Sequence, residues 1–169
     1  MTEREGAAGK TVINEMQTVI RYEELAAAAI QARQRAYAPY SRFLVGAALL
    51  DSEGRIWMGC NVENASYPAG SCAERNAVCK AVSEGARDFS AIAICGAPQD
   101  AENSGEFPEC PPCGICRQVM REFGRPEMEI VLVKSEREYR VLTLAELLPE
   151  SFGPDHLGGG DPACVNSGR

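Results

Sequence analysis

The fold is decided by an apolar stretch in the middle of the chain, Phe89-Ser-Ala-Ile-Ala-Ile-Cys-Gly96. Its apolar side chains fall on both faces of an extended segment, which is typical of a strand at the centre of a sheet. A helical pattern follows over Cys113–Phe123, and a second buried strand follows over Met128–Val133. Helices that alternate with apolar strands in this way favour an α/β fold.

The pattern continues outward from this centre in both directions. Helices are predicted at Tyr22–Ala36 and Ala73–Glu84. A hairpin of Phe43–Leu50 and Arg55–Val62 is predicted around the turn Asp51–Gly54. Near the end of the chain, a strand is predicted at Tyr139–Leu142 and a capping box at Thr143–Glu146. Pro39 would end the first helix, and Gly124 in the C′ position would close the helix at Cys113–Phe123. Together these elements predict a three-layer α-β-α sandwich on a mixed five-stranded sheet.

The length of 169 residues argues for a single domain. We expect a flexible extension over residues 1–19, the folded domain over residues 20–157 and a disordered tail over residues 158–169. The formal net charge of −7 is against a broad electrostatic surface for nucleic acid. The sequence has no apolar run of about eighteen residues, and Met1–Lys10 lack the apolar stretch of a secretory signal. We therefore expect a cytoplasmic protein that binds neither nucleic acid nor membrane.

The chain has eight cysteines and one histidine, His156. In a reducing cytosol, clustered cysteines more often bind metal or carry out chemistry than form disulfides. Because histidine is almost absent, any metal site must be built mainly from thiolates or carboxylates. Cys79 and Cys95 each lie within an apolar pattern and fit the bland interpretation of buried cysteines.

Two short elements carry the remaining signal, Cys72-Ala-Glu74-Arg75 and Pro112-Cys113-Gly-Ile-Cys116. Each opens a predicted helix, where free backbone N–H groups and the helix dipole favour the thiolate. Two such helix starts side by side would bring three sulfurs together, and three ligands with an open fourth position are typical of a catalytic zinc. Cys110 complicates the pattern because it lies three residues before Cys113, but we expect that it is not a ligand.

Glu74 has two interpretations. Ser71-Cys-Ala-Glu74 fits a capping box, in which the carboxylate would accept a hydrogen bond from the Ser71 backbone. Alternatively, Glu74 lies beside the open position of the metal and moves protons. The residues alone leave both interpretations open.

The arrangement C-A-E followed by P-C-G-I-C resembles the cysteine-only variant of the zinc nucleobase deaminase signature. The chain is similar to the cytidine deaminase family, in particular to its small three-cysteine class of homotetramers. Further matching segments, in the order of the family, are Tyr40–Ala48, Gly59–Ala65, Tyr67-Pro68, Cys116-Arg-Gln118 and Leu147–Pro154. Leu44 departs from the family, which usually has proline there.

The resemblance implies hydrolytic deamination of cytidine and deoxycytidine to uridine and deoxyuridine with release of ammonia, in pyrimidine salvage. It implies one zinc ion per chain, bound by Cys72, Cys113 and Cys116, with Glu74 protonating N3 of the base and then the departing amine. The other implied roles are substrate binding for Phe43, Asn61, Glu63 and Ala73, stabilisation of the thiolates for Arg75, and contacts between subunits at the active site for Tyr67 and Phe152.

Three other functions compete with this one. A zinc deaminase could act on another aminopyrimidine nucleoside, such as a nucleoside antibiotic, although Asn61-Val-Glu63 favours cytidine. A zinc-stabilised binding module without turnover would not require Glu74. A redox protein that uses Cys113 and Cys116 would leave Cys72 and Glu74 unexplained.

Overall fold

The computed structural model describes residues 22–101 and 106–157. The predicted N-terminal extension (residues 1–19) and C-terminal tail (residues 158–169) therefore lie outside the described residues. Among the described residues, no helix has the length and apolarity needed to cross a membrane.

The centre of the molecule is a five-stranded sheet with the order β2-β1-β3-β4-β5. Its strands are β1 (Phe43–Asp51), β2 (Ile56–Cys60), β3 (Phe89–Pro98), β4 (Gly124–Val133) and β5 (Tyr139–Thr143). The pair β3 and β4 is parallel, and the other neighbouring pairs are antiparallel. The predicted mixed five-stranded sheet is confirmed, with the apolar stretch that begins at Phe89 as its central strand.

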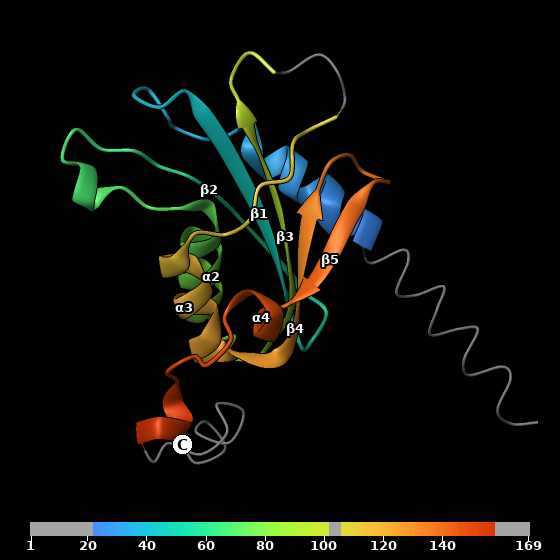
Figure 1. Cartoon of the computed structure of the whole chain (residues 1–169). Coiled ribbons are helices and arrows are strands. Elements are labelled where there is room, and N and C mark those ends of the chain that lie inside the picture. The colour runs from blue at the N-terminus through green and yellow to red at the C-terminus, as the bar shows by residue number, and fades with distance from the viewer. Residues whose placement is uncertain (1–21, 102–105, 158–169) are drawn as a thin grey trace, which may run out of the picture.

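Helices cover both faces of the sheet (Figure 1). A helix over residues 22–33 packs on one face, where Leu25 and Ala29 meet the side chains of β1, β3 and β4. The other face carries α2 (Ala73–Ser83), α3 (Gly114–Phe123) and α4 (Leu144–Leu147), which enclose a second core with Phe89 and Met120 completely covered. The three-layer α-β-α sandwich is therefore confirmed. Two short 3-10 helices, η1 (Tyr67–Ala69) and η2 (Pro154–Leu157), lie outside these layers.

The helix α2 packs closely on strand β2. A Cβ atom on Gly59 of β2 would lie 2.4 Å from the carbonyl oxygen of Ala73 and 2.4 Å from the nitrogen of Ala77. Only glycine allows the backbone of α2 to rest directly on the strand. The first turn of α2 is thereby held at one end of the sheet, and this turn begins with Cys72.

Two details of the predicted elements are wrong. The first helix ends at residue 33 rather than at Ala36, because the next residues form tighter turns and Tyr37 then donates a backbone hydrogen bond to Asn61. Gly124 is not left-handed: its φ is −101° and β4 begins there, four residues before the predicted start. The position lies close to two methionines, since a Cβ atom there would be 2.4 Å from Sδ of Met128 and 3.0 Å from the carbonyl oxygen of Met120.

The predicted capping box at the start of α4 is confirmed. The Thr143 hydroxyl accepts a hydrogen bond from the Glu146 backbone at 3.2 Å, and the Glu146 carboxylate accepts one from the Thr143 backbone at 2.7 Å. The turn at Asp51–Gly54 is also as predicted, with Gly54 in the left-handed region at φ 84°.

Candidate active site

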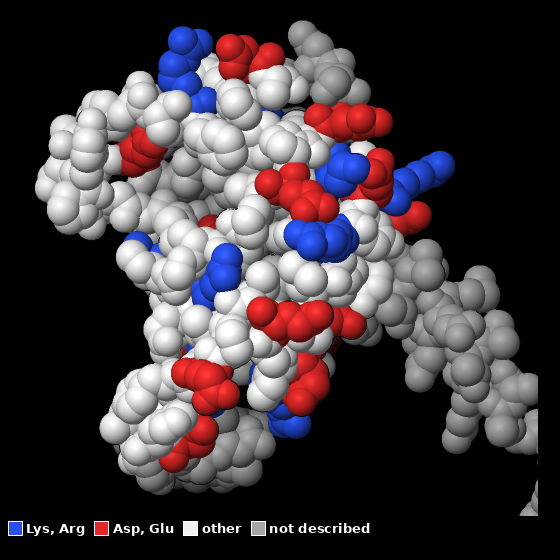
Figure 2. All heavy atoms as spheres, in the orientation of Figure 1, with Lys and Arg blue, Asp and Glu red and all other residues white. Residues whose placement is uncertain are grey.

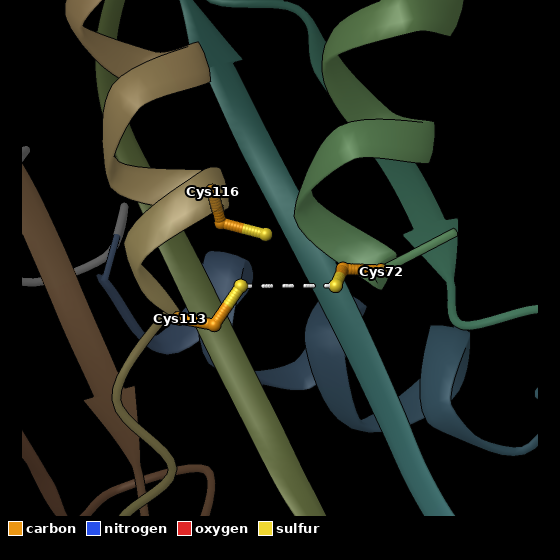
Figure 3. Close-up of side chains that lie close together, drawn as sticks. All are labelled: Cys72, Cys113 and Cys116. Atoms are coloured by element: carbon orange, nitrogen blue, oxygen red, sulfur yellow. Dashed lines mark hydrogen bonds between the residues drawn. The ribbon is translucent and has the colours of Figure 1, made fainter. Parts of the chain in front are cut away.

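Three cysteine side chains converge where α2 and α3 begin (Figure 3). Cys72 is the N-cap of α2, Cys113 is the N-cap of α3, and Cys116 lies in the first turn of α3. Their sulfur atoms all lie within 4.8 Å of one another, and the sulfurs of Cys72 and Cys113 are 3.9 Å apart. The convergence predicted from the two sequence elements is confirmed.

The thiols of this cluster compete for ionisation. A hydrogen bond from Cys116 is the largest influence on the Cys72 thiol and lowers its pKa to about 6, against the opposing effects of burial and of Glu74. The same hydrogen bond, together with burial, raises the pKa of Cys116 far above its ordinary value. One thiolate thus forms at the expense of its neighbour. A soft divalent cation would remove this competition by binding all three as thiolates, so the donor set fits zinc.

Glu74 lies next to the cluster on the second residue of α2, and only 5% of it is exposed. Burial raises the pKa of its carboxyl group, while its own backbone N–H and the Cys116 thiol act in the opposite direction. The capping-box interpretation is wrong, because the helix begins one residue later than that motif requires, with Cys72 as N-cap and no side-chain capping bond. The Ser71 backbone N–H instead donates to the carbonyl oxygen of Val62 at 2.9 Å.

Arg75 is half-buried in the first turn of α2. Its positive charge is the smallest of the influences that lower the pKa of Cys72. Within residues 22–101 and 106–157, no hydrogen bond joins Arg75 to a sulfur. Its role in stabilising the thiolates therefore stays a prediction.

Asn61 and Glu63 both lie in the loop after β2, and both hold the chain before and within β1. The Asn61 amide accepts a hydrogen bond from the Val45 backbone at 2.8 Å and donates one to the Phe43 carbonyl at 2.9 Å. The Glu63 carboxylate accepts hydrogen bonds from the Tyr40 and Ser41 backbones at 2.9 and 3.2 Å. These bonds fix the orientation of both side chains, and their role in reading the ribose stays a prediction.

Glu63 also lines a hollow of 340 Å³ together with Tyr67 of η1. The other lining residues are Tyr40, Ser41, Asn64 and Gly70. A hydrogen bond from the Ser41 hydroxyl, opposed by partial burial, is the largest influence that lowers the pKa of Glu63. The hollow therefore has a negative charge on one wall and an aromatic side chain on another.

The remaining predicted residues lie at different depths. Ala73 is completely buried at the start of α2, and Phe43 is half-buried beside Gly96 and Cys110. Tyr67 is 75% exposed, with its ring centroid 5.9 Å from that of Tyr40. Phe152 is 56% exposed and lies in the segment that follows α4. None of these four lies in the thiol cluster, and their roles stay predictions.

Sequence reasoning missed the function of Arg117. Its Nε donates to the Pro112 carbonyl at 2.8 Å, and its Nη1 donates to the Leu147 carbonyl at 2.7 Å. Arg117 thus ties the loop that leads into Cys113 to the end of α4. The match of Cys116-Arg-Gln118 to the family was the signal, but it gave no role for the arginine.

Cys110 lies outside the cluster, which among the described residues contains Cys72, Cys113 and Cys116 alone. Burial raises the pKa of the Cys110 thiol to about 11, so it remains a neutral side chain packed against the core. This placement agrees with the expectation that Cys110 is not a ligand.

Comparison with known proteins decides the family of this site. The profile described as "Cytidine and deoxycytidylate deaminase zinc-binding region" matches residues 20–132, well over half of the chain. The chain belongs to this deaminase family. The match includes all three cysteines of the cluster and Glu74, so the chain is a zinc-binding deaminase in which Cys72, Cys113 and Cys116 are positioned to bind a metal ion.

Individual members of the family match over most of their length. The chain is 44% identical to the cytidine deaminase of Sporosarcina psychrophila, over 80% of this chain and 93% of that one. It is 47% identical to the cytidine deaminase of Halalkalibacterium halodurans, over 76% and 92% of the two chains. The crystal structure of cytidine deaminase from Burkholderia pseudomallei superposes with a TM-score of 0.66 and 47% identity, over 76% of this chain and 97% of that one.

Proposed function

We propose that this protein is a zinc-dependent cytidine deaminase, which hydrolyses cytidine and deoxycytidine to uridine and deoxyuridine and releases ammonia. The observation that carries the proposal is the buried carboxyl group of Glu74 next to three convergent thiols. A structural zinc site would have no use for a carboxyl group buried at this cost. Similarity to cytidine deaminases over more than nine tenths of their length supports the choice of substrate.

Cys72, Cys113 and Cys116 would hold one zinc ion per chain. When bound, zinc supplies a Lewis acid that lowers the pKa of water to about 7 and so provides a nucleophile at neutral pH. Glu74 holds and moves the protons: it takes one from the attacking water and delivers it to N3 of the cytosine ring. It then takes the second from the new hydroxyl group at C4 and delivers it to the amine, so that the C4–N bond breaks, ammonia leaves and the ring becomes uracil. Because burial raises the pKa of the Glu74 carboxyl group, Glu74 is better suited to hold a proton between these transfers than an exposed carboxyl group would be.

The loop after β2 would recognise the sugar. Asn61 and Glu63 offer an amide and a carboxylate to the ribose hydroxyl groups, and Phe43 and Ala73 would contact the substrate nearby. A carboxylate at this position repels phosphate, which favours nucleosides over nucleotides and RNA. The surface agrees with this preference, because acidic and basic side chains are interspersed on the face shown in Figure 2. We accordingly propose that the protein binds neither nucleic acid nor membrane and acts in the cytoplasm, in pyrimidine salvage.

We also propose that the protein assembles as a homotetramer. The exposed aromatic side chains of Tyr67 and Phe152 support this assembly. Phe152 would reach over the base bound in a neighbouring subunit, and Tyr67 would contribute at the same interface. An aromatic neighbour of the cytosine ring contributes about 0.5–1.5 kcal/mol beyond the burial of area.

The proposed reaction is tested by the loss of cytidine absorbance together with zinc quantitation on the purified protein. We expect one zinc per chain and turnover of cytidine and deoxycytidine, with cytidine 5′-monophosphate and free cytosine as much poorer substrates. Cys79→Ala is the matched control: the expectation that Cys79 is buried is wrong, because its thiol lies exposed on α2, outside the cluster. Zinc-loaded protein that turns over neither nucleoside would contradict the proposal.

The proposed assembly is tested separately by light scattering and steady-state kinetics on the intact chain and on a chain that ends at Pro149. Truncation should weaken both assembly and catalysis while each subunit still folds and binds zinc. A monomeric intact protein with full activity would contradict the assembly and leave the reaction unaffected.

A further inference from the structure

The segment that carries Phe152 is fastened to α3 of its own subunit. Arg121 of α3 donates from Nε to the Ser151 hydroxyl at 2.9 Å and from Nη2 to the Asp155 carboxylate at 2.5 Å. One turn earlier on the same helix, the Gln118 amide donates to the carbonyl oxygen of Phe152 at 3.0 Å. Two side chains of one helix thus hold the segment on both sides of Phe152 and at its own backbone.

The guanidinium of Arg121 lies directly against the backbone of this segment. A Cβ atom on Gly153 would be 2.5 Å from Cζ of Arg121 and 2.6 Å from Nη2. Only 14% of the Arg121 side chain is exposed, so most of it is covered by the residues that it binds. Arginine suits this position because its planar fork can donate in two fixed directions at once, which lysine cannot do.

The ring of Phe152 is held within the segment and still faces outward. It stacks on His156 with the two centroids 5.1 Å apart, and Nδ1 of His156 accepts a hydrogen bond from the Gly153 backbone at 3.1 Å. The ring is nevertheless 56% exposed. An exposed phenylalanine on a segment that is fixed by so many polar contacts is unexpected if the segment serves its own core alone.

We propose that Arg121, assisted by Gln118, is a positioning residue that presents Phe152 to the active site of a neighbouring subunit. The inference rests on the proposed role of Phe152 between subunits and extends it to the residues that set its direction. The helix that carries Gln118 and Arg121 also begins at the metal ligands Cys113 and Cys116. The helix α3 would therefore carry two of the proposed metal ligands of its own subunit and also orient Phe152 toward the active site of a neighbouring subunit.

The test is a double-mutant cycle of Arg121→Ala, Phe152→Ala and the double variant. Phe152→Ala should lower kcat/KM for cytidine by about 3–10-fold, as expected for a lost aromatic contact with the base. Arg121→Ala should cause a similar loss, and the double variant should lose no more than Phe152→Ala alone, because Arg121 acts through Phe152. Zinc content should stay at one per chain in all three.

Two further variants separate positioning from a general structural effect. Gly153→Ala places a methyl group where the guanidinium lies, so it should reproduce the loss seen for Arg121→Ala without removing a charge. Arg140→Ala is the matched control. It removes an arginine of the edge strand β5 that pairs with Glu109 at 2.7 Å, and it should leave kcat/KM unchanged.

The outcomes distinguish this inference from the one on which it rests. The positioning role of Arg121 is overturned if Arg121→Ala has normal kinetics, or if the losses in kcat/KM multiply in the double variant. In either case, a lowered kcat/KM for Phe152→Ala still supports the role of Phe152 between subunits. Normal kinetics for Phe152→Ala overturn that role itself, and the positioning inference with it.

Discussion

Two of the polar centres among the described residues are built in opposite ways. At the β1–β2 turn, Asp51 is buried and its carboxylate accepts four hydrogen bonds, from the backbones of Glu53 and Arg55 and from the side chains of Arg55 and Trp57. At the starts of α2 and α3, three thiols and the buried Glu74 face one another without a comparable set of donors.

The pKa values reflect this difference. Burial by itself raises the pKa of Asp51, but hydrogen bonds from Trp57 and Arg55 outweigh it and hold the pKa below 3.8. For Glu74 burial prevails and the pKa is raised. The protein thus satisfies the Asp51 carboxylate with its own hydrogen-bond donors and forms a completed centre. The thiol cluster with Glu74 is an incomplete centre, which requires a ligand from outside. A completed centre stabilises the fold, and an incomplete one can do chemistry.

The largest expected effect comes from removing a sulfur of the incomplete centre. Cys72→Ala should abolish zinc binding and turnover, because two thiols cannot hold zinc as three do. Cys110→Ala, which removes a neighbouring thiol outside the cluster, should keep its zinc. Metal analysis of both purified variants checks the prediction. If the Cys110 variant lost zinc and the Cys72 variant kept it, the assignment of ligands would be wrong.

The second effect isolates the proton carrier from the metal. Glu74→Gln preserves the shape of the side chain and the helix start, but the amide cannot carry a proton. We expect folded, zinc-loaded protein with turnover lower by about 10²–10⁴-fold, the range for a lost general acid–base. Steady-state kinetics beside metal analysis measure both properties. Turnover close to that of the unaltered protein would end the proposed mechanism.

The sequence predicted the incomplete centre well for a physical reason. Its cysteines mark the starts of two helices, and the N-terminus of a helix is visible locally in the residues around it. The capping-box alternative for Glu74 failed by one residue, because the Ser71 backbone pairs with Val62 and the helix starts only at the next residue. That pairing joins Ser71 to a residue outside the motif and leaves no pattern within it.

Other features escaped prediction in the same way. The bonds of Arg117 and Arg121 run to carbonyl and hydroxyl groups thirty residues away, and nothing near either arginine indicates the partner. Gly124 shows the converse error: a glycine after a helix suggested a left-handed cap, but its backbone is extended and β4 begins at this residue. The periodicity of apolar residues therefore predicts the helices and strands, whereas contacts between distant parts of the chain decide where these elements end.

The completed centre should affect stability rather than catalysis. Asp51→Asn keeps an acceptor for the two backbone donors but presents an amide N–H₂ group to Arg55 and Trp57, so we expect a loss of about 2–3 kcal/mol in the free energy of unfolding. Activity per folded molecule should be unchanged. Urea unfolding followed by circular dichroism measures the first quantity, and a fall in kcat without loss of stability would contradict the separation of the two centres.

The same variant has a defined pH dependence. Because the folded-state pKa of Asp51 lies below its ordinary value of 3.8, the ionised carboxylate stabilises the fold above that pH, and this stability is lost as the pH falls through the lowered pKa. The stability difference between the unaltered protein and Asp51→Asn should therefore be constant near neutral pH and shrink in acid. A difference that grew in acid would show that the carboxylate is not the stabilising form.

The smallest effect comes from removing one donor of the completed centre. Trp57→Phe deletes the indole N–H that lies 2.9 Å from the Asp51 carboxylate and keeps an aromatic ring on β2. Asp51 retains three hydrogen bonds, so no buried charge is left unpaired, and the loss should be about 1 kcal/mol. Since the chain has a single tryptophan, circular dichroism must replace fluorescence as the probe. A loss of stability as large as that of Asp51→Asn would mean that the indole N–H alone stabilises the carboxylate. The contrast between a centre satisfied by its own hydrogen bonds and the thiol cluster would then fail.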